Sequence, residues 1–204
     1  MRIASIADHL DLVETIARWH WDEWGHTDPG GSADEWTARL RTFTSRDRIP
    51  TMFVALEGQD LLGSVTLNEH DMSTHHDLTP WLSGVYVKPD ARGRGVASAL
   101  VRHAMDRAAA IGIDRLYLYT RSARGLYETL GWRTIAADEY EGRLVHIMVA
   151  ELAADSPPTQ VPTATGSGES PAAPLPAPRP PRSADPSRCR PALDLESRPS
   201  ARHR

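Results

Sequence analysis

The sequence predicts a single domain of the α/β (α+β) class. Its central sheet is expected to be mixed but mostly antiparallel, with about six to seven strands, and to be flanked by about four helices. The first observation behind this prediction is that short apolar runs, several of them alternating, occur between longer runs whose apolar residues recur at helical spacing. The second is the order of these runs, β-α-α-β-β-β-α-β-α-β-β, which packs helices on a sheet.

The first predicted elements are a short strand and two helices. Residues 2–6 are a strand candidate, and residues 8–24 a helix that a glycine ends. The stripe at helical spacing consists of Leu10, Val13, Ile16, Ala17 and His20. In the run SADEW, Ser32 is a candidate N-cap and Glu35 follows three residues later, which forms a capping box. The second helix is therefore expected over residues 32–44.

Three strands and a longer helix come next. Residues 51–56 and 61–68 are strand candidates, joined by the hairpin turn EGQD. A polar loop, EHDMSTHHDLTP, separates them from a fourth strand over residues 81–87. Residues 96–110 have a helical pattern that Gly112 ends.

The last part of the predicted domain holds three strands and a short helix. Residues 115–119 alternate as a strand, and residues 123–130 form a short helix followed by Gly131. Residues 133–139 and 144–149 are expected to pair with each other around the turn YEGR.

From residue 155 onward the composition changes. This segment holds 12 of the 16 prolines and the single cysteine, Cys189, and it has no tryptophan, tyrosine or phenylalanine. Such a segment buries too little apolar surface to offset its chain entropy. We therefore expect a folded domain over residues 1–154 and a disordered Pro/Arg-rich C-terminal tail over residues 155–204.

Charge and targeting signals narrow the class of protein. The tail carries seven of the 23 basic residues and five of the 27 acidic ones, so its net charge is +2 and that of the remaining chain is −6. An acidic domain argues against a nucleic-acid partner and for a cationic one. One cysteine excludes an intramolecular disulfide and a cysteine-cluster metal site. With no signal-peptide pattern and no apolar run of membrane-spanning length, we expect a cytoplasmic protein without a membrane partner.

The run ARGRGVA between the fourth strand and the third helix is a candidate phosphate site. Backbone amides of residues 93–97 lie where a helix begins, and such amides bind phosphate groups. Gly93 and Gly95 allow close backbone approach, and the arginines Arg92 and Arg94 add positive charge. Two other interpretations remain open: ordinary turn chemistry and a basic surface patch.

Two motifs together resemble the GNAT acyltransferase superfamily. Arg92, Gly95 and Ala97, which follow VYVKPDA, match its acetyl-CoA loop, Gln/Arg-x-x-Gly-x-Gly/Ala. Downstream, LYLYTRSARGLYETLGW is similar to the next strand, helix and turn of that family. The resemblance covers about residues 2–149 and implies a GNAT-type domain that acts as an acetyl-CoA-dependent N-acetyltransferase. The alternative is a non-catalytic module that senses acyl-CoA.

The resemblance also implies residue roles, with acetyl-CoA as co-substrate and no metal. The pyrophosphate would lie on the loop formed by Arg92, Gly93, Arg94, Gly95, Val96 and Ala97. The pantetheine arm would follow the fourth strand along Val85, Tyr86 and Val87. Tyr127 matches the tyrosine that contacts CoA and protonates the departing thiolate; the alternative is an aromatic anchor on a short helix.

A general base is harder to assign. A lysine-like acceptor must lose a proton at a cost of roughly 4.6 kcal/mol at pH 7. Many family members place a glutamate early on the fourth strand, but this position falls near Trp81, which cannot act as a base. We keep Glu69 and His76, in the polar loop, as candidate bases against the simpler interpretation of a solvated loop. No helical His-x-x-x-His spacing supports a metal site there.

The acceptor site is expected beside the first helices and the fifth strand. Trp21 and Trp24 are candidates to stack on a cationic amine, and the acids between them to attract it. Tyr117 and Tyr119 share one face of their strand and either line the acceptor pocket or pack under a helix. The acceptor is expected to be a small amine, such as a polyamine or amino sugar, or a protein amine. The protein is expected to act as a monomer or homodimer.

Overall fold

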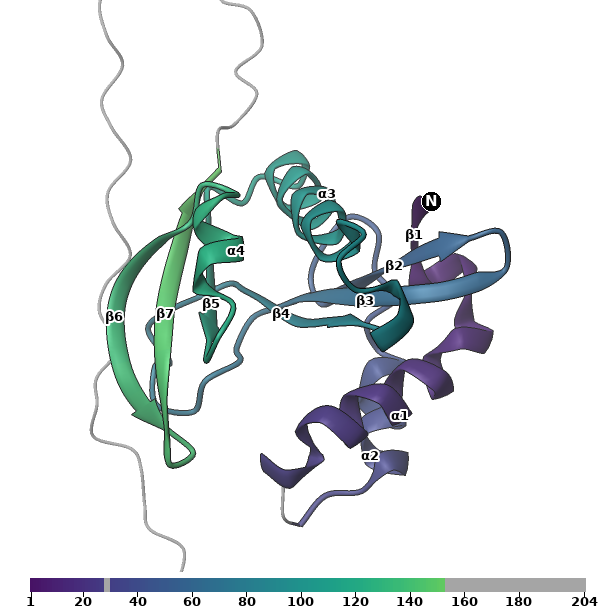
Figure 1. Cartoon of the computed structure of the whole chain (residues 1–204), viewed down its shortest axis with the longest axis horizontal. Coiled ribbons are helices and arrows are strands. Elements are labelled where there is room, and N and C mark those ends of the chain that lie inside the picture. The colour runs from purple at the N-terminus through teal and green to yellow at the C-terminus, as the bar shows by residue number, and fades with distance from the viewer. Residues whose placement is uncertain (28–29, 153–204) are drawn as a thin grey trace, which may run out of the picture. The chain divides into compact units, whose positions relative to one another are not determined.

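The computed structural model describes residues 1–27 and 30–152, and the predicted tail with Cys189 lies outside these residues. Within them, seven strands form one sheet in the order β1-β2-β3-β4-β5-β7-β6, and four α-helices pack beside it (Figure 1). Only the β4–β5 pair is parallel. This is the predicted fold class.

The elements occur in the predicted order. The strands are β1 (Arg2–Ser5), β2 (Thr51–Glu57), β3 (Asp60–Asn68), β4 (Trp81–Val87), β5 (Arg115–Thr120), β6 (Arg133–Tyr140) and β7 (Arg143–Glu151). The α-helices are α1 (Val13–Trp24), α2 (Ala33–Leu40), α3 (Val96–Ala110) and α4 (Arg124–Glu128). Short 3₁₀ turns cover Ile6–Asp8, Leu10–Leu12, Gly25–Thr27 and Pro89–Ala91. None of the helices in this part of the chain has the length and apolar character needed to cross a membrane.

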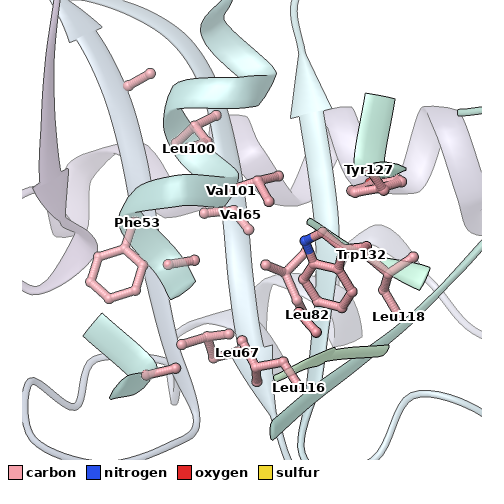
Figure 2. Close-up of a cluster of buried hydrophobic side chains, with 14 of the residues drawn as sticks. Phe53, Val65, Leu67, Leu82, Leu100, Val101, Leu116, Leu118, Tyr127 and Trp132 are labelled. Carbon is pink, nitrogen blue, oxygen red and sulfur yellow. The ribbon is translucent and has the colours of Figure 1, made fainter. Parts of the chain in front are cut away.

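Helices cover both faces of the first half of the sheet. Residues 51–56 in β2 are all buried because α3 covers one face while α1 and α2 cover the other (Figure 1). Phe53 faces α3, in a core cluster that contains Val65, Leu100 and Val101 (Figure 2). Met52 belongs to a second cluster with side chains of α1 and α2. Burial on two faces explains why β2 reads as a continuous apolar run.

A third cluster lies on the other half of the sheet, beneath the loop between β3 and β4. Its buried members are Met72, Trp81, Val145 and Ile147. Partly buried tyrosines from β5 and β6 pack against it. The loop that the sequence predicted as polar therefore carries one apolar anchor, Met72, which ties it to the sheet.

The sheet opens between β4 and β5. Their ladder contains the single pair Trp81 and Tyr117, beside a hydrogen bond from the Tyr117 N–H to the Pro80 carbonyl. Beyond that point the two strands diverge (Figure 1). A β-bulge at Gly84, whose φ is +57°, also shifts the register between β3 and β4. The edge of β4 that faces β5 is therefore left open along most of its length.

Two helix boundaries differ from the prediction. The first α-helix begins at Val13 rather than residue 8, because residues 6–12 form 3₁₀ turns. The second begins as predicted, with Ser32 Oγ accepting a hydrogen bond from the Glu35 N–H at 3.2 Å. It ends at Leu40 rather than residue 44, because hydrogen bonds to residues three positions earlier tighten the chain and bury Phe43.

Candidate functional site

The turn between β4 and α3 has the geometry of an anion cradle. Gly93 and Gly95 have φ values of +74° and +78°, in the left-handed region, and a Cβ at either would meet no atom within 4 Å. The glycines are therefore required by the backbone conformation rather than by lack of space. The N–H of Ala99 bonds to the Gly95 carbonyl, so the amides of residues 96–98 precede the first helical hydrogen bond. Their N–H groups and the helix dipole favour an anion at this end of α3.

The two arginines of the turn are held by the protein itself. Arg92 Nε donates to the Val87 carbonyl at 3.0 Å, and its guanidinium lies 6.0 Å from the ring centre of Tyr86. Arg94 donates to both carboxylate oxygens of Glu57, at 2.9 and 2.8 Å, and lowers the pKa of that carboxyl. The positive charge of Arg94 is thus offset by a carboxylate, whereas Arg92 remains beside the open edge of β4.

Further residues predicted to bind acetyl-CoA are Val96 in the turn and Val85, Tyr86 and Val87 in β4. Val96 is buried in the core, so only its amide faces the turn. Val85, Tyr86 and Val87 are half-buried at the end of β4, where no strand pairs with their outer edge. An extended ligand can add to such an edge as a further strand. The Val87 carbonyl, however, already accepts the hydrogen bond from Arg92.

Tyr127, on α4, is buried in the first core cluster. Its side chain is 7% exposed and packs in the cluster of Leu118 and Trp132 (Figure 2), with 6.1 Å between the Tyr127 and Trp132 ring centres. Burial raises the pKa of Tyr127 to about 12. Among the described residues no hydrogen bond involves its hydroxyl. The hydroxyl is therefore protonated at neutral pH and free to donate to a ligand.

The aromatic run of α1 faces two ways. Trp24 and Trp19 lie against Tyr86 of β4, with ring-centre distances of 6.3 and 5.2 Å. Trp21 instead makes an edge contact with Trp36 of α2, at 6.1 Å, and its ring would lie 2.6 Å from a Cβ on Gly25. The structure therefore brings Trp24, but not Trp21, against the Tyr86 ring of β4.

His20 is a polar residue of the site that sequence reasoning left without a role. Its ring is 3% exposed, and Nε2 lies 2.9 Å from Ser64 Oγ. Since Ser64 Oγ donates to the carbonyl of Gly84, the His20 N–H donates to Ser64. Burial lowers the pKa of His20 to about 3, so the ring is neutral. Its place in the apolar stripe predicted the burial, but not the link from α1 to the β4 bulge.

The two tyrosines of β5 pack around the buried Trp81. Tyr117 and Tyr119 have ring centres 6.0 and 6.4 Å from that of Trp81. Tyr119 also makes an edge contact with Tyr140, at 5.5 Å, and burial raises its pKa. The two predicted acceptor residues on β5 thus pack against the third cluster, and the nearby charge that acts most strongly on Tyr119 is that of Asp71.

The candidate bases in the loop between β3 and β4 lie at its surface. Glu69 and His76 are exposed, and neither has a hydrogen bond within the described part of the chain. Of the histidines in this loop, His75 contacts the sheet. Its Nε2 lies 2.9 Å from the Asp138 carboxyl of β6, and this contact lowers the pKa of that carboxyl. The structure instead places Asp71, which sequence reasoning did not single out, in a partly buried position. Over residues 1–27 and 30–152, no group of three or more His, Cys, Asp or Glu side chains could hold a metal ion.

The site thus combines an open edge on β4 with an anion cradle at the start of α3. The model of the acetyltransferase (GNAT) family matches residues 13–132 of the chain, which is more than half of it. The chain therefore belongs to the GNAT family, and the predicted enzyme class, an acetyltransferase, is confirmed.

Solved structures share the fold. An aminoglycoside 6'-acetyltransferase type Ii has a TM-score of 0.59 at 16% identity, covering 75% of this chain and 98% of its own. An aminoglycoside 6'-N-acetyltransferase complexed with coenzyme A has a TM-score of 0.57 at 15% identity, with coverages of 75% and 98%. A spermidine N-acetyltransferase chimera, in part from Vibrio cholerae, has a TM-score of 0.55 at 20% identity, with coverages of 74% and 95%. A search of curated proteins gave no match.

Proposed function

We propose that the protein transfers the acetyl group of acetyl-CoA to a primary amine by direct attack, and that it does so in the cytoplasm. The observation that carries the proposal is the continuity of two features: the open edge of β4 leads directly into the turn of Gly93 and Gly95 at the start of α3. An extended chain that ends in a pyrophosphate fits this combination, because it can pair with a strand edge and place its charge on helix amides.

The protein's own groups supply three functions to the bound thioester. The amides of residues 96–98 hold the pyrophosphate, with Arg92 beside them. The outer backbone groups of β4 align the arm and polarise the thioester carbonyl, which favours attack. The Tyr127 hydroxyl donates to the sulfur as the C–S bond breaks, and the apolar surroundings that raise its pKa favour a neutral thiol as well.

The acceptor is proposed to be an amine that is cationic in solution, either a small polyamine or amino sugar or a protein amine. The support is the acidic character of the chain outside the tail, together with Asp22 and Glu23, which are exposed on α1 beside Trp24. Two of the solved structures with this fold are named for action on aminoglycosides and one for action on spermidine, so both kinds of amine belong in a substrate screen.

The test uses the full-length chain. Acetyl-CoA is first titrated by calorimetry, and a panel of polyamines, aminoglycosides and peptide amines is then added while thiol release is followed. We expect binding, and release with at least one amine. Binding without release by any amine would favour the alternative of a non-catalytic acyl-CoA sensor, and the absence of binding would contradict the proposed cradle.

Replacing Tyr127 by phenylalanine is expected to lower turnover roughly 100-fold while changing the affinity for acetyl-CoA by less than about two-fold. The reason is that the ring fills the same core space, whereas the hydroxyl acts only when the thiolate departs. Steady-state kinetics and calorimetry on Tyr127→Phe measure the two effects separately. Unchanged turnover would reassign Tyr127 to packing alone.

A further inference from the structure

The bulge in β4 lies against the ring of His20. Between the paired residues of β3 and β4, Val65 alone stands opposite two residues, Gly84 and Val85. A Cβ on Gly84 would lie 3.0 Å from the Cε1 atom of His20, so the ring on α1 approaches the backbone of the bulge closely. A bulge of this kind interrupts the regular ladder of backbone hydrogen bonds. The orientation of the peptide group between Gly84 and Val85 therefore depends on side chains as well.

Two buried side chains connect α1 to the bulge. His20 Nε2 lies 2.9 Å from Ser64 Oγ, and Ser64 Oγ donates to the Gly84 carbonyl at 3.4 Å. A hydroxyl has one proton, so its donation to the carbonyl leaves Ser64 to accept the N–H of His20. Both side chains are buried, which protects the two hydrogen bonds from competition with water. The Gly84 carbonyl is thereby held toward β3.

The same contact sets the direction of the next backbone N–H. The peptide between Gly84 and Val85 is trans, so its carbonyl and the Val85 N–H point in opposite directions. Since Ser64 of β3 holds the carbonyl, the Val85 N–H points away from β3. On its other side β4 pairs with β5 only at Trp81 and Tyr117, so no strand occupies the position beside Val85. This N–H is therefore one of the outer backbone groups through which β4 is proposed to polarise the thioester.

The other end of this open stretch of β4 is also held by a side chain. Arg92 Nε donates to the Val87 carbonyl at 3.0 Å. Between the two held carbonyls, the rings of Trp19 and Trp24 pack on Tyr86, at 5.2 and 6.3 Å. Contacts from α1, β3 and the turn thus fix this backbone where β5 does not pair with it. A donor that is fixed before the reaction stabilises developing charge without a cost of reorientation.

We propose that His20 and Ser64 are positioning residues of the acetyl transfer, which orient the Val85 N–H toward the thioester carbonyl of acetyl-CoA. This inference rests on the proposed function. As the amine attacks, the carbonyl oxygen gains negative charge, and a hydrogen bond from the Val85 N–H stabilises it. His20 and Ser64 act on this step only through the peptide between Gly84 and Val85. Burial lowers the pKa of His20 to about 3, so its ring is too weak a base to take the amine proton near pH 7.

The first test compares binding with transfer in full-length Ser64→Ala. The affinity for coenzyme A, which has no thioester carbonyl, is expected to change by less than about two-fold in calorimetry. The rate of acetyl transfer in a single turnover is expected to fall about 10-fold, since outright removal of such a donor costs roughly 100-fold or more. The amine is one that the wild type acetylates.

A matched control is available on β2. Thr51 is buried there, and its hydroxyl donates to the Ser45 carbonyl at 2.6 Å. Thr51→Val removes a buried hydroxyl that donates to a backbone carbonyl, as Ser64→Ala does, but β3 separates β2 from β4 in the sheet. We expect Thr51→Val to lower stability and to keep the wild-type rate of transfer.

The second test observes the thioester itself. Acetyl-CoA with an isotopic label at the carbonyl carbon is bound in the absence of amine, and isotope-difference infrared spectra give the frequency of its C=O stretch. We expect a lower frequency on the wild-type protein than in solution, because a hydrogen bond to the oxygen weakens the C=O bond. The lowering is expected to be smaller in Ser64→Ala and unchanged in Thr51→Val.

A rescue variant separates the hydrogen bond from the packing of the ring. His20→Phe keeps an aromatic ring beside Trp24 and Tyr86 but has no donor, so it is expected to behave as Ser64→Ala does. His20→Gln keeps an N–H donor and is expected to retain the wild-type frequency and most of the transfer rate. Either Ser64→Ala or His20→Phe suffices if the other does not fold.

Two results would overturn the positioning role. One is a wild-type transfer rate and C=O frequency in Ser64→Ala or in His20→Phe. The other is an equal loss in His20→Phe and His20→Gln, which would mean that the ring acts by packing alone. Failure of the wild-type chain to bind acetyl-CoA or to transfer its acetyl group would instead overturn the proposed function.

Discussion

Replacing Gly95 by glutamate is expected to abolish the binding of acetyl-CoA. Gly95 has a φ of +78° at the N-cap of α3, and the space around its missing Cβ is open, so a side chain at this position extends into the proposed phosphate site. A carboxylate about 5 Å from a phosphate charge costs roughly 3 kcal/mol at an effective dielectric constant of about 20, which corresponds to a loss of affinity of more than about 100-fold. Calorimetry with acetyl-CoA measures the effect.

The same helix supplies a matched control for backbone strain. Gly112, which follows α3, is exposed with a φ of +82°, and a Cβ there would also meet no atom within 4 Å. Gly112→Glu introduces the same residue into the same backbone region at the opposite end of α3, so it is expected to lower stability comparably but to leave acetyl-CoA affinity unchanged. Gly95→Asn, which tolerates positive φ without adding charge, separates the charge effect from the conformational one. Wild-type affinity in folded Gly95→Glu would rule out this turn as the phosphate site.

The sequence predicted the site's framework best where several local signals agree. The predicted bounds of β4 and α3 match the observed ones, because a proline and two glycines separate them and another glycine follows the helix. The start of α1 and the end of α2 were wrong by four or five residues. Those ends depend on tertiary contacts, such as the burial of Phe43, which local propensity does not contain.

Side-chain partners within the site were less predictable. The left-handed backbone at Gly93 and Gly95 follows from residue type, but the pairing of Arg94 with Glu57 depends on how β2 lies beside the turn. Trp21 and Trp24 looked alike in sequence, and they differ because α1 contacts both α2 and β4. Burial raises the pKa of the Asp71 carboxyl, and this burial depends on how the loop between β3 and β4 packs on the sheet. No periodicity or motif in the loop carries that information.

His20 is expected to make the protein sensitive to acid. Its pKa is about 3 in the folded state against 6.5 for an ordinary histidine, because burial disfavours the charged ring. Between these values the unfolded chain binds more protons than the native protein, so the free energy of unfolding falls as the pH falls from 6.5 toward 3. The difference corresponds to about 5 kcal/mol over the whole range, and above pH 6.5 the penalty is absent. This loss is comparable to the entire stability of many domains.

The measurement is urea unfolding of the wild type and of His20→Gln at several pH values between 4 and 8. Glutamine has an N–H that can replace the donor to Ser64, but it does not titrate, so His20→Gln is expected to be less stable than wild type at pH 7 and to lose less stability on acidification. His26→Gln, at an exposed histidine just beyond α1, is expected to keep the wild-type acid slope. An equal slope in His20→Gln would mean that the acid response arises elsewhere, in the surface carboxylate pairs.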